Sequence, residues 1–112
     1  MIQALKGLII SRELVPVFVS GRDEVCRHET YAWLKRQFDE FRGFTYLPQL
    51  FMRPAGDMRR DSIVKREIYE AEIKAAWNVY AIFDDRPQVI RECWQALGFG
   101  DRIFNVGTGK EF

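Results

Sequence analysis

Three short segments place polar side chains suited to phosphate chemistry directly after apolar runs. They are Ser20-Gly21-Arg22, the stretch from Arg53 to Asp57, and Asp84-Asp85-Arg86. Hydroxyl and guanidinium groups bind phosphate oxygens well, whereas paired carboxylates suit Mg²⁺, which takes oxygen ligands and keeps several waters. The three segments therefore indicate a magnesium-assisted phosphate site, provided that the fold brings them to one edge.

Each of these charged stretches also has a purely structural explanation. Ser-Gly-Arg is a common turn sequence, and Asp84-Asp85 could cap a helix that begins near Pro87. Asp61 and Lys65 have the i, i+4 spacing, acid first, of an ordinary helical ion pair. These explanations are independent of one another, so requiring all of them at once is a series of coincidences. A shared site is the simpler interpretation.

The elements that must position these residues follow from the apolar pattern. Short apolar runs predict strands over residues 15–19, 50–52, 79–83 and 103–106, and helical spacing predicts helices over 2–13 and 29–41, from Asp61 onward and from Pro87 to Gly98. In the last three helices the expected inward positions are Tyr31, Leu34, Phe38 and Phe41; Val64, Ile68, Ala71 and Ala75; and Val89, Ile90, Cys93, Trp94 and Leu97.

Strands and helices alternate along the whole chain, which predicts an α/β fold. The expected architecture is a three-layer α/β/α, Rossmann-like parallel sheet with right-handed crossovers. Ligands bind at the carboxyl ends of the strands in such sheets. The three polar segments would therefore share one rim.

Composition limits the other possibilities. The 112 residues suit one domain, 1–112, and the 47% of apolar residues can fill a core. A net charge of +1 means that any contact with a polynucleotide is local. Two cysteines without a disulfide framework fit a reducing cytosol, and neither a membrane-spanning run nor a signal-peptide pattern is present. We expect a cytoplasmic protein without membrane contact.

Two weaker motifs do not support a site. Cys26 and His28 have no second Cys/His pair, as a structural zinc site requires. The stretch from Gly107 to Lys110 resembles part of a phosphate-binding loop, but it lacks the upstream glycine spacing and is followed by Glu111 instead of Ser or Thr. No kinase activity is expected from this chain.

The order Ser20, Lys65, Asp84-Asp85 resembles motifs two, three and four of the haloacid-dehalogenase superfamily. Longer stretches resemble the 3′-phosphatase domain of phage and bacterial polynucleotide kinases: VFVSGRDEVCR (17–27), LFMRPAGDMRRDSIVKRE (50–67), IFDDRPQV (82–89) and the ending GKEF. The resemblance implies hydrolysis of a phosphate monoester through an aspartyl phosphate, with Mg²⁺ as cofactor.

The resemblance also implies roles for individual residues. Ser20 would hydrogen-bond the phosphoryl group, and Lys65 would neutralise charge on the phosphate, supported by Asp61 one turn earlier. Asp84 would bind magnesium, and Asp85 would assist through a metal-bound water or through Lys65. The expected substrate is a nucleic-acid 3′-phosphate end. Arg22 would contact the phosphate or the nucleic-acid end. Arg53, Arg59 and Arg60 are weaker candidates for contacts with the backbone, and solvated surface is the alternative for Arg59 and Arg60.

Motif one of the superfamily, an Asp-x-Asp-Gly-Thr segment on a central first strand, is missing: residues 1–14 contain no Asp. The expected sheet therefore lacks that strand, and the isolated chain is expected to be inactive. A complementing chain or segment could supply the strand, two copies could exchange elements, or the flanking strands could close together. The alternative function is a non-catalytic remnant that binds phosphorylated ends or a partner.

A response-regulator receiver domain also uses paired acids, a hydroxyl and a lysine. In that family the acidic pair comes first and the lysine last, whereas Asp84-Asp85 comes last here. The order of the residues therefore argues against a receiver domain. A plain structural α/β domain remains open as the simplest alternative.

Overall fold

The computed structural model describes residues 7–9, 14–38 and 49–106 of the chain, which forms two compact units, Met1–Asp57 and Met58–Phe112. The predicted helix over 2–13 is seen at residues 7–9, which are helical, and otherwise lies outside the described residues, as do Phe41, the side chain of Phe38 and the stretch from residue 107 to the end. None of the described helices is long and apolar enough to cross a bilayer.

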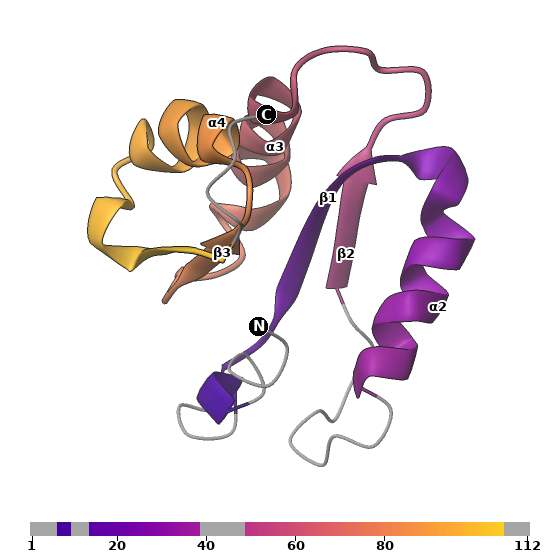
Figure 1. Ribbon diagram of the computed structural model, residues 1–112, viewed down its shortest axis with the longest axis horizontal. Coiled ribbons are helices and arrows are strands. Elements are labelled where there is room, and N and C mark those ends of the chain that lie inside the picture. The colour runs from indigo at the N-terminus through magenta and orange to yellow at the C-terminus, as the bar shows by residue number, and fades with distance from the viewer. Residues whose placement is uncertain (1–6, 10–13, 39–48, 107–112) are drawn as a thin grey trace. The chain divides into compact units, whose positions relative to one another are not determined.

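The first unit is built on a parallel pair of strands, β1 (Val17–Asp23) and β2 (Gln49–Arg53), as Figure 1 shows. Both strands were predicted, but β1 begins two residues later than expected and continues through the polar segment after it. Pro16 precedes β1 directly and cannot donate to a ladder, which suits the position before a strand.

Helix α2 (Arg27–Phe38) covers this strand pair. Its buried Leu34 packs with Leu50 and Met52 of β2, and Phe18, Cys26 and Tyr31 lie against them. The predicted stripe is therefore confirmed at Tyr31 and Leu34. The helix begins two residues before the predicted start because a 3-10 turn, Glu24–Cys26, leads directly into it.

The second unit contains a second parallel pair, β3 (Ile82–Asp84) and β4 (Ile103–Asn105), and the helices α3 (Asp61–Ile68) and α4 (Pro87–Val89). Both helices continue in π-helical hydrogen bonding, over Tyr69–Ile73 and Ile90–Gln95. The α/β class with parallel strands is confirmed. Within the described residues, β1 pairs with β2 alone and β3 with β4 alone.

The core of the second unit lies under α4 and its π-helical continuation. Its buried members are Val89, Ile90, Cys93 and Trp94, and Tyr69, Ile82, Leu97, Phe99 and Ile103 pack against them. All five predicted inward positions of this helix face the core, and Gly98 follows with φ 93°, which confirms the predicted glycine end. Burial raises the pKa of the Cys93 thiol to about 12, so Cys93 is a neutral core residue.

The inward face predicted for α3 is only partly correct. Val64 is buried and Ile68 is half-buried, but Ala71 and Ala75 are exposed and Ile73 is buried in their place. The reason is the change to π-helical hydrogen bonding at Tyr69, which widens the turn and shifts the phase of every later residue. The predicted positions follow from one α-helical period along the whole helix.

Candidate functional site

Ser20 and Arg22 lie at an irregularity near the end of β1. Ser20 is opposite Met52 on β2, and Asp23 is opposite Arg53, so Gly21 and Arg22 are two extra residues on β1. Such a bulge re-aims side chains near a strand end. The amide of Arg22 donates to Ser20 Oγ at 3.1 Å, and the Arg22 side chain is exposed. The structure thus brings the hydroxyl and the guanidinium to one exposed turn.

Asp23, which we did not predict as a site residue, ties this turn to the loop after β2. Its carboxylate accepts from the amides of Val25 at 2.8 Å and Gly56 at 2.9 Å. Gly56 has φ 76°, a conformation that favours glycine. Hydrogen bonds from the Val25 and Gly56 amides lower the pKa of the Asp23 carboxyl below its ordinary value of 3.8. An Asp just before a helical turn was the available signal.

Arg53 fastens the same two loops from the other strand. Its guanidinium donates to the carbonyl of Gly21 at 2.7 Å and to the carbonyl of Asp57 at 3.0 Å. These two hydrogen bonds tie the Ser20–Arg22 turn to the loop after β2. Its predicted contact with substrate stays a prediction, and the geometry gives it a supporting role in the shape of the turn.

Replacing Asp23 with Asn is expected to make the free energy of unfolding less dependent on pH in the acidic range. A lowered carboxyl pKa contributes stability above the ordinary value of 3.8 that is lost as the pH falls through the lowered pKa. The variant lacks this contribution, so the wild type should lose more free energy of unfolding than the variant between about pH 5 and pH 2. Urea unfolding across this range measures it, with exposed Asp101→Asn as the matched control. Parallel profiles for wild type and Asp23→Asn would contradict the two amide contacts.

In the second unit, Lys65 and Asp84 form a buried ion pair. Lys65 Nζ lies 3.1 Å from Asp84 Oδ2, and the residues are only 8% and 7% exposed. The same oxygen accepts from Trp94 Nε1 at 3.0 Å, while Oδ1 accepts from the amide of Arg86 at 3.1 Å. The predicted Lys65 and Asp84 are thus brought together from α3 and β3. Trp94, expected only as a core residue, is a third member of this cluster.

The neighbouring carboxylate of Asp85 lies in a different environment. Asp85 is exposed, and within the described part of the chain no hydrogen bond or ion pair engages its side chain. Lys65 forms its ion pair with Asp84, and the predicted assistance of Asp85 through a metal-bound water or through Lys65 stays a prediction. A carboxylate oxygen accepts about two hydrogen bonds, so Asp84 Oδ1 keeps one position and Asp85 keeps both oxygens. Two adjacent carboxylates of this kind fit Mg²⁺, which often binds one or two carboxylates and several waters.

Asp61 is the first residue of α3, and Arg60 takes the N-cap position without a side-chain cap. The helix predicted from Asp61 onward thus begins at that residue, and Asp61 is not its N-cap. The Asp61 carboxylate instead pairs with the guanidinium of Arg86, which follows the acidic pair. This contact joins the start of α3 to the end of β3, so Asp61 lies beside the segment that carries Asp84 and Asp85. Its predicted support of Lys65 stays a prediction.

Arg59 and Arg60 lie at the exposed start of α3 and are engaged in ion pairs. Arg59 contacts Glu67 at 2.6 Å, and Arg60 contacts Glu92 at 2.9 Å. Exposed pairs of this kind contribute only about 0–1 kcal/mol. The predicted contacts of Arg59 and Arg60 with a nucleic-acid backbone stay a prediction.

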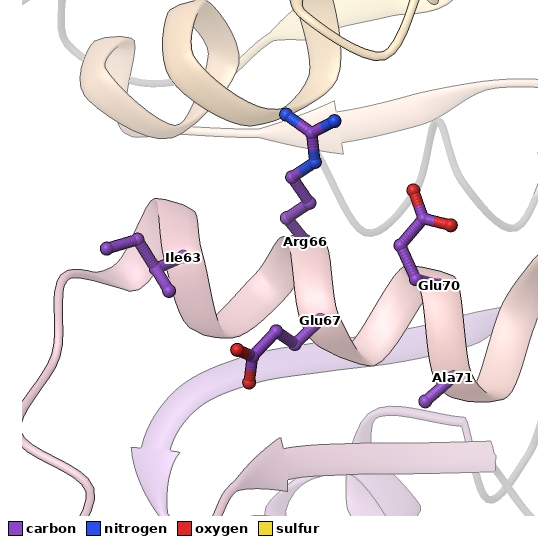
Figure 2. A pocket seen from close by; sticks show the side chains of 5 residues that line it. All are labelled: Ile63, Arg66, Glu67, Glu70 and Ala71. Atoms are coloured by element: carbon purple, nitrogen blue, oxygen red, sulfur yellow. The ribbon is translucent and has the colours of Figure 1, made fainter.

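A wide hollow along α3 and its π-helical continuation contains none of the predicted site residues. Ile63, Arg66, Glu67, Glu70 and Ala71 line it, and Lys65 is not among them (Figure 2). Two carboxylates against one guanidinium make the lining unfavourable for a phosphate. The chemistry of the second unit lies with the buried cluster at the end of β3.

Comparison with known proteins shows similarity to a protein family and to a viral protein. A family model described as the polynucleotide kinase PNKP phosphatase domain matches residues 2–110. The chain is also 36% identical over 106 residues to a protein of Autographa californica nuclear polyhedrosis virus that is named as a bifunctional polynucleotide kinase/RNA ligase. The alignment covers 95% of this chain and 14% of that relative, so the chain spans a small part of the viral protein.

Proposed function

Because the chain belongs to the polynucleotide kinase phosphatase-domain family of haloacid-dehalogenase-type phosphatases, we propose that residues 1–112 form the larger part of one magnesium-dependent nucleic-acid 3′-phosphatase domain. The observation that carries this proposal is the buried Lys65–Asp84 pair beside the exposed Asp85. Shielding from water strengthens the attraction between a lysine and a phosphate. The adjacent carboxylates of Asp84 and Asp85 fit a metal ion that binds the same phosphate.

The proposed roles follow from the geometry of each unit. Ser20 and Arg22, on the exposed turn, would donate hydrogen bonds to the phosphoryl oxygens. Lys65 would stabilise the negative charge on the transferring phosphoryl group, and Asp84 and Asp85 would bind Mg²⁺. When bound, Mg²⁺ supplies charge neutralisation for phosphoryl transfer. Each of these groups would lower the energy of a transition state that spreads negative charge over the phosphate.

The attacking carboxylate has to come from outside these residues, because the 112 residues contain no Asp-x-Asp segment. A nucleophilic aspartate would form a bond to phosphorus as the bond from phosphorus to the 3′-oxygen breaks, and water would then release inorganic phosphate. We propose that a segment outside these 112 residues supplies this aspartate by adding a strand to the sheet. A second copy of the same residues could exchange elements with the first, but it would bring no Asp-x-Asp segment.

The direct test is phosphate release from a 3′-phosphorylated oligonucleotide with Mg²⁺. The chain alone should show no turnover, and adding a peptide that carries Asp-x-Asp-Gly-Thr should restore it. The matched control peptide has Asn in place of the first Asp and should be inactive. Chelation of Mg²⁺ should abolish the restored activity.

The other outcomes separate the alternatives. Robust turnover by the pure chain alone contradicts the need for a second segment. Binding of the phosphorylated end without hydrolysis, even with the peptide, favours a non-catalytic remnant that recognises such ends. The absence of both binding and hydrolysis rejects both functions.

A further inference from the structure

The indole of Trp94 donates to the same carboxylate oxygen that Lys65 contacts. Trp94 Nε1 lies 3.0 Å and Lys65 Nζ lies 3.1 Å from Asp84 Oδ2, and Trp94 itself is only 5% exposed. A buried indole N–H requires an acceptor. Here that acceptor belongs to the buried ion pair, although a backbone carbonyl would satisfy the indole equally well.

Two donors on one oxygen fix the orientation of the carboxylate. Oδ2 accepts from Lys65 and Trp94, and Oδ1 accepts from the amide of Arg86. An oxygen with two donors has no further lone pair to offer, so rotation of the Asp84 carboxylate would break several bonds at once. Lys65 therefore meets one defined oxygen from one direction.

The position of Lys65 determines where its remaining donors point. An ammonium group has three N–H donors. Within the described part of the chain, Asp84 is the acceptor that Lys65 contacts. The other N–H groups are thus left for an incoming phosphate, and their direction depends on how the Asp84 carboxylate is held.

The core in turn fixes the indole. Trp94 meets Tyr69 edge to face with ring centroids 6.4 Å apart. The π-helical segment Ile90–Gln95 carries Trp94 with the buried Ile90 and Cys93. Local π-helical turns occur frequently at functional sites. The aromatic core therefore holds the indole, and the indole holds the carboxylate that pairs with Lys65.

We propose that Trp94 is a positioning residue that orients Lys65 through Asp84 for contact with the substrate phosphate. This inference rests on the proposed phosphatase function. It assigns to Trp94 a role in turnover that its packing alone does not require. Lys65 touches the substrate in this scheme, and Trp94 acts through Asp84.

The first test uses the chain alone and needs no activity. Trp94→Phe keeps an aromatic ring in the core and removes the N–H donor. Phe99→Leu perturbs the same aromatic cluster without touching Asp84, and it serves as the matched control. In NMR spectra of ¹³C-labelled protein, the Cε signal of Lys65 should shift in Trp94→Phe and stay in place in Phe99→Leu.

The second test measures turnover in the chain complemented with the Asp-x-Asp peptide. Trp94→Phe should lower kcat about tenfold with little change in KM, since a hydrogen bond to a charged group is lost while binding surfaces remain. Phe99→Leu should keep kcat near the wild-type value. An unchanged kcat in Trp94→Phe, or an equal loss in both variants, would overturn the positioning role.

The two tests separate the two proposals. If the complemented wild type shows no turnover, the phosphatase proposal fails, and the Lys65 signal alone decides whether Trp94 orients the lysine. If the wild type is active but the Lys65 signal is the same in wild type and Trp94→Phe, the inference about Trp94 fails and the phosphatase proposal stands.

Discussion

Replacing Lys65 with Met is expected to lower the free energy of unfolding by about 3–5 kcal/mol, because it leaves the Asp84 carboxylate buried without its counter-charge. Lys65 and Asp84 have side chains only 10% and 5% exposed, so water cannot take the place of the ammonium group. Urea or guanidinium unfolding at neutral pH measures the change. The loss is large against the total stability of a domain, so a shift in the unfolding midpoint should be obvious.

The neighbouring residue supplies the matched control. Arg66 is exposed, and Arg66→Met should change stability by only about 0.5 kcal/mol. Adding Asp84→Asn to Lys65→Met removes the uncompensated charge and keeps an acceptor for the Trp94 indole, so the double variant should regain part of the loss. If Lys65→Met were as stable as Arg66→Met, the buried ion pair would not exist in solution.

Replacing Asp85 with Asn is expected to reduce magnesium-dependent turnover by about 10²–10³-fold in the complemented chain, the scale for losing one preorganised electrostatic group. Asp85 is exposed, and no hydrogen bond or ion pair in the described part of the chain engages its side chain. The substitution should therefore leave the free energy of unfolding within about 0.5 kcal/mol of the wild type. A large loss of activity without a loss of stability is the signature of a ligand for the metal.

The measurement is the rate of phosphate release as a function of MgCl₂ concentration, with unfolding followed in parallel. Asp101→Asn removes another exposed carboxylate of the second unit and should keep both properties. Asp84→Asn should differ from both variants by losing stability as well as turnover, since Asp84 is buried among three donors. Wild-type rates for Asp85→Asn at every magnesium concentration would rule out Asp85 as a metal ligand.

The success of the sequence-based predictions differed between elements. The helix after Pro87 was predicted with its full inward face because Pro87, the apolar spacing and Gly98 all indicate one element. The inward face of α3 was predicted only near its start, since no residue in the sequence marks the change to π-helical hydrogen bonding at Tyr69. The start of β1 was misplaced because Val15 and Pro16 are apolar but precede the ladder.

At the candidate site, too, some residues were predicted and others were missed. Lys65 and Asp84 were identified from residue type and order, and they do meet in the structure. Asp23 and Trp94 were missed because their contacts join distant segments: Asp23 binds Gly56, and Trp94 binds Asp84. Their residue types indicated a helix cap and a core residue, respectively, and did not identify the acceptor or donor on another element.

The α/β class, the family and the identity of the chemical groups were readable from the linear chain, because periodicity, residue type and motif order are local properties. The folded molecule was needed to show that Asp84 is buried and Asp85 is exposed, and that the Trp94 indole shares an oxygen with Lys65. Adjacent carboxylates are chemically equivalent until the fold buries one and leaves the other exposed. Only packing between α3, α4 and β3 distinguishes the two.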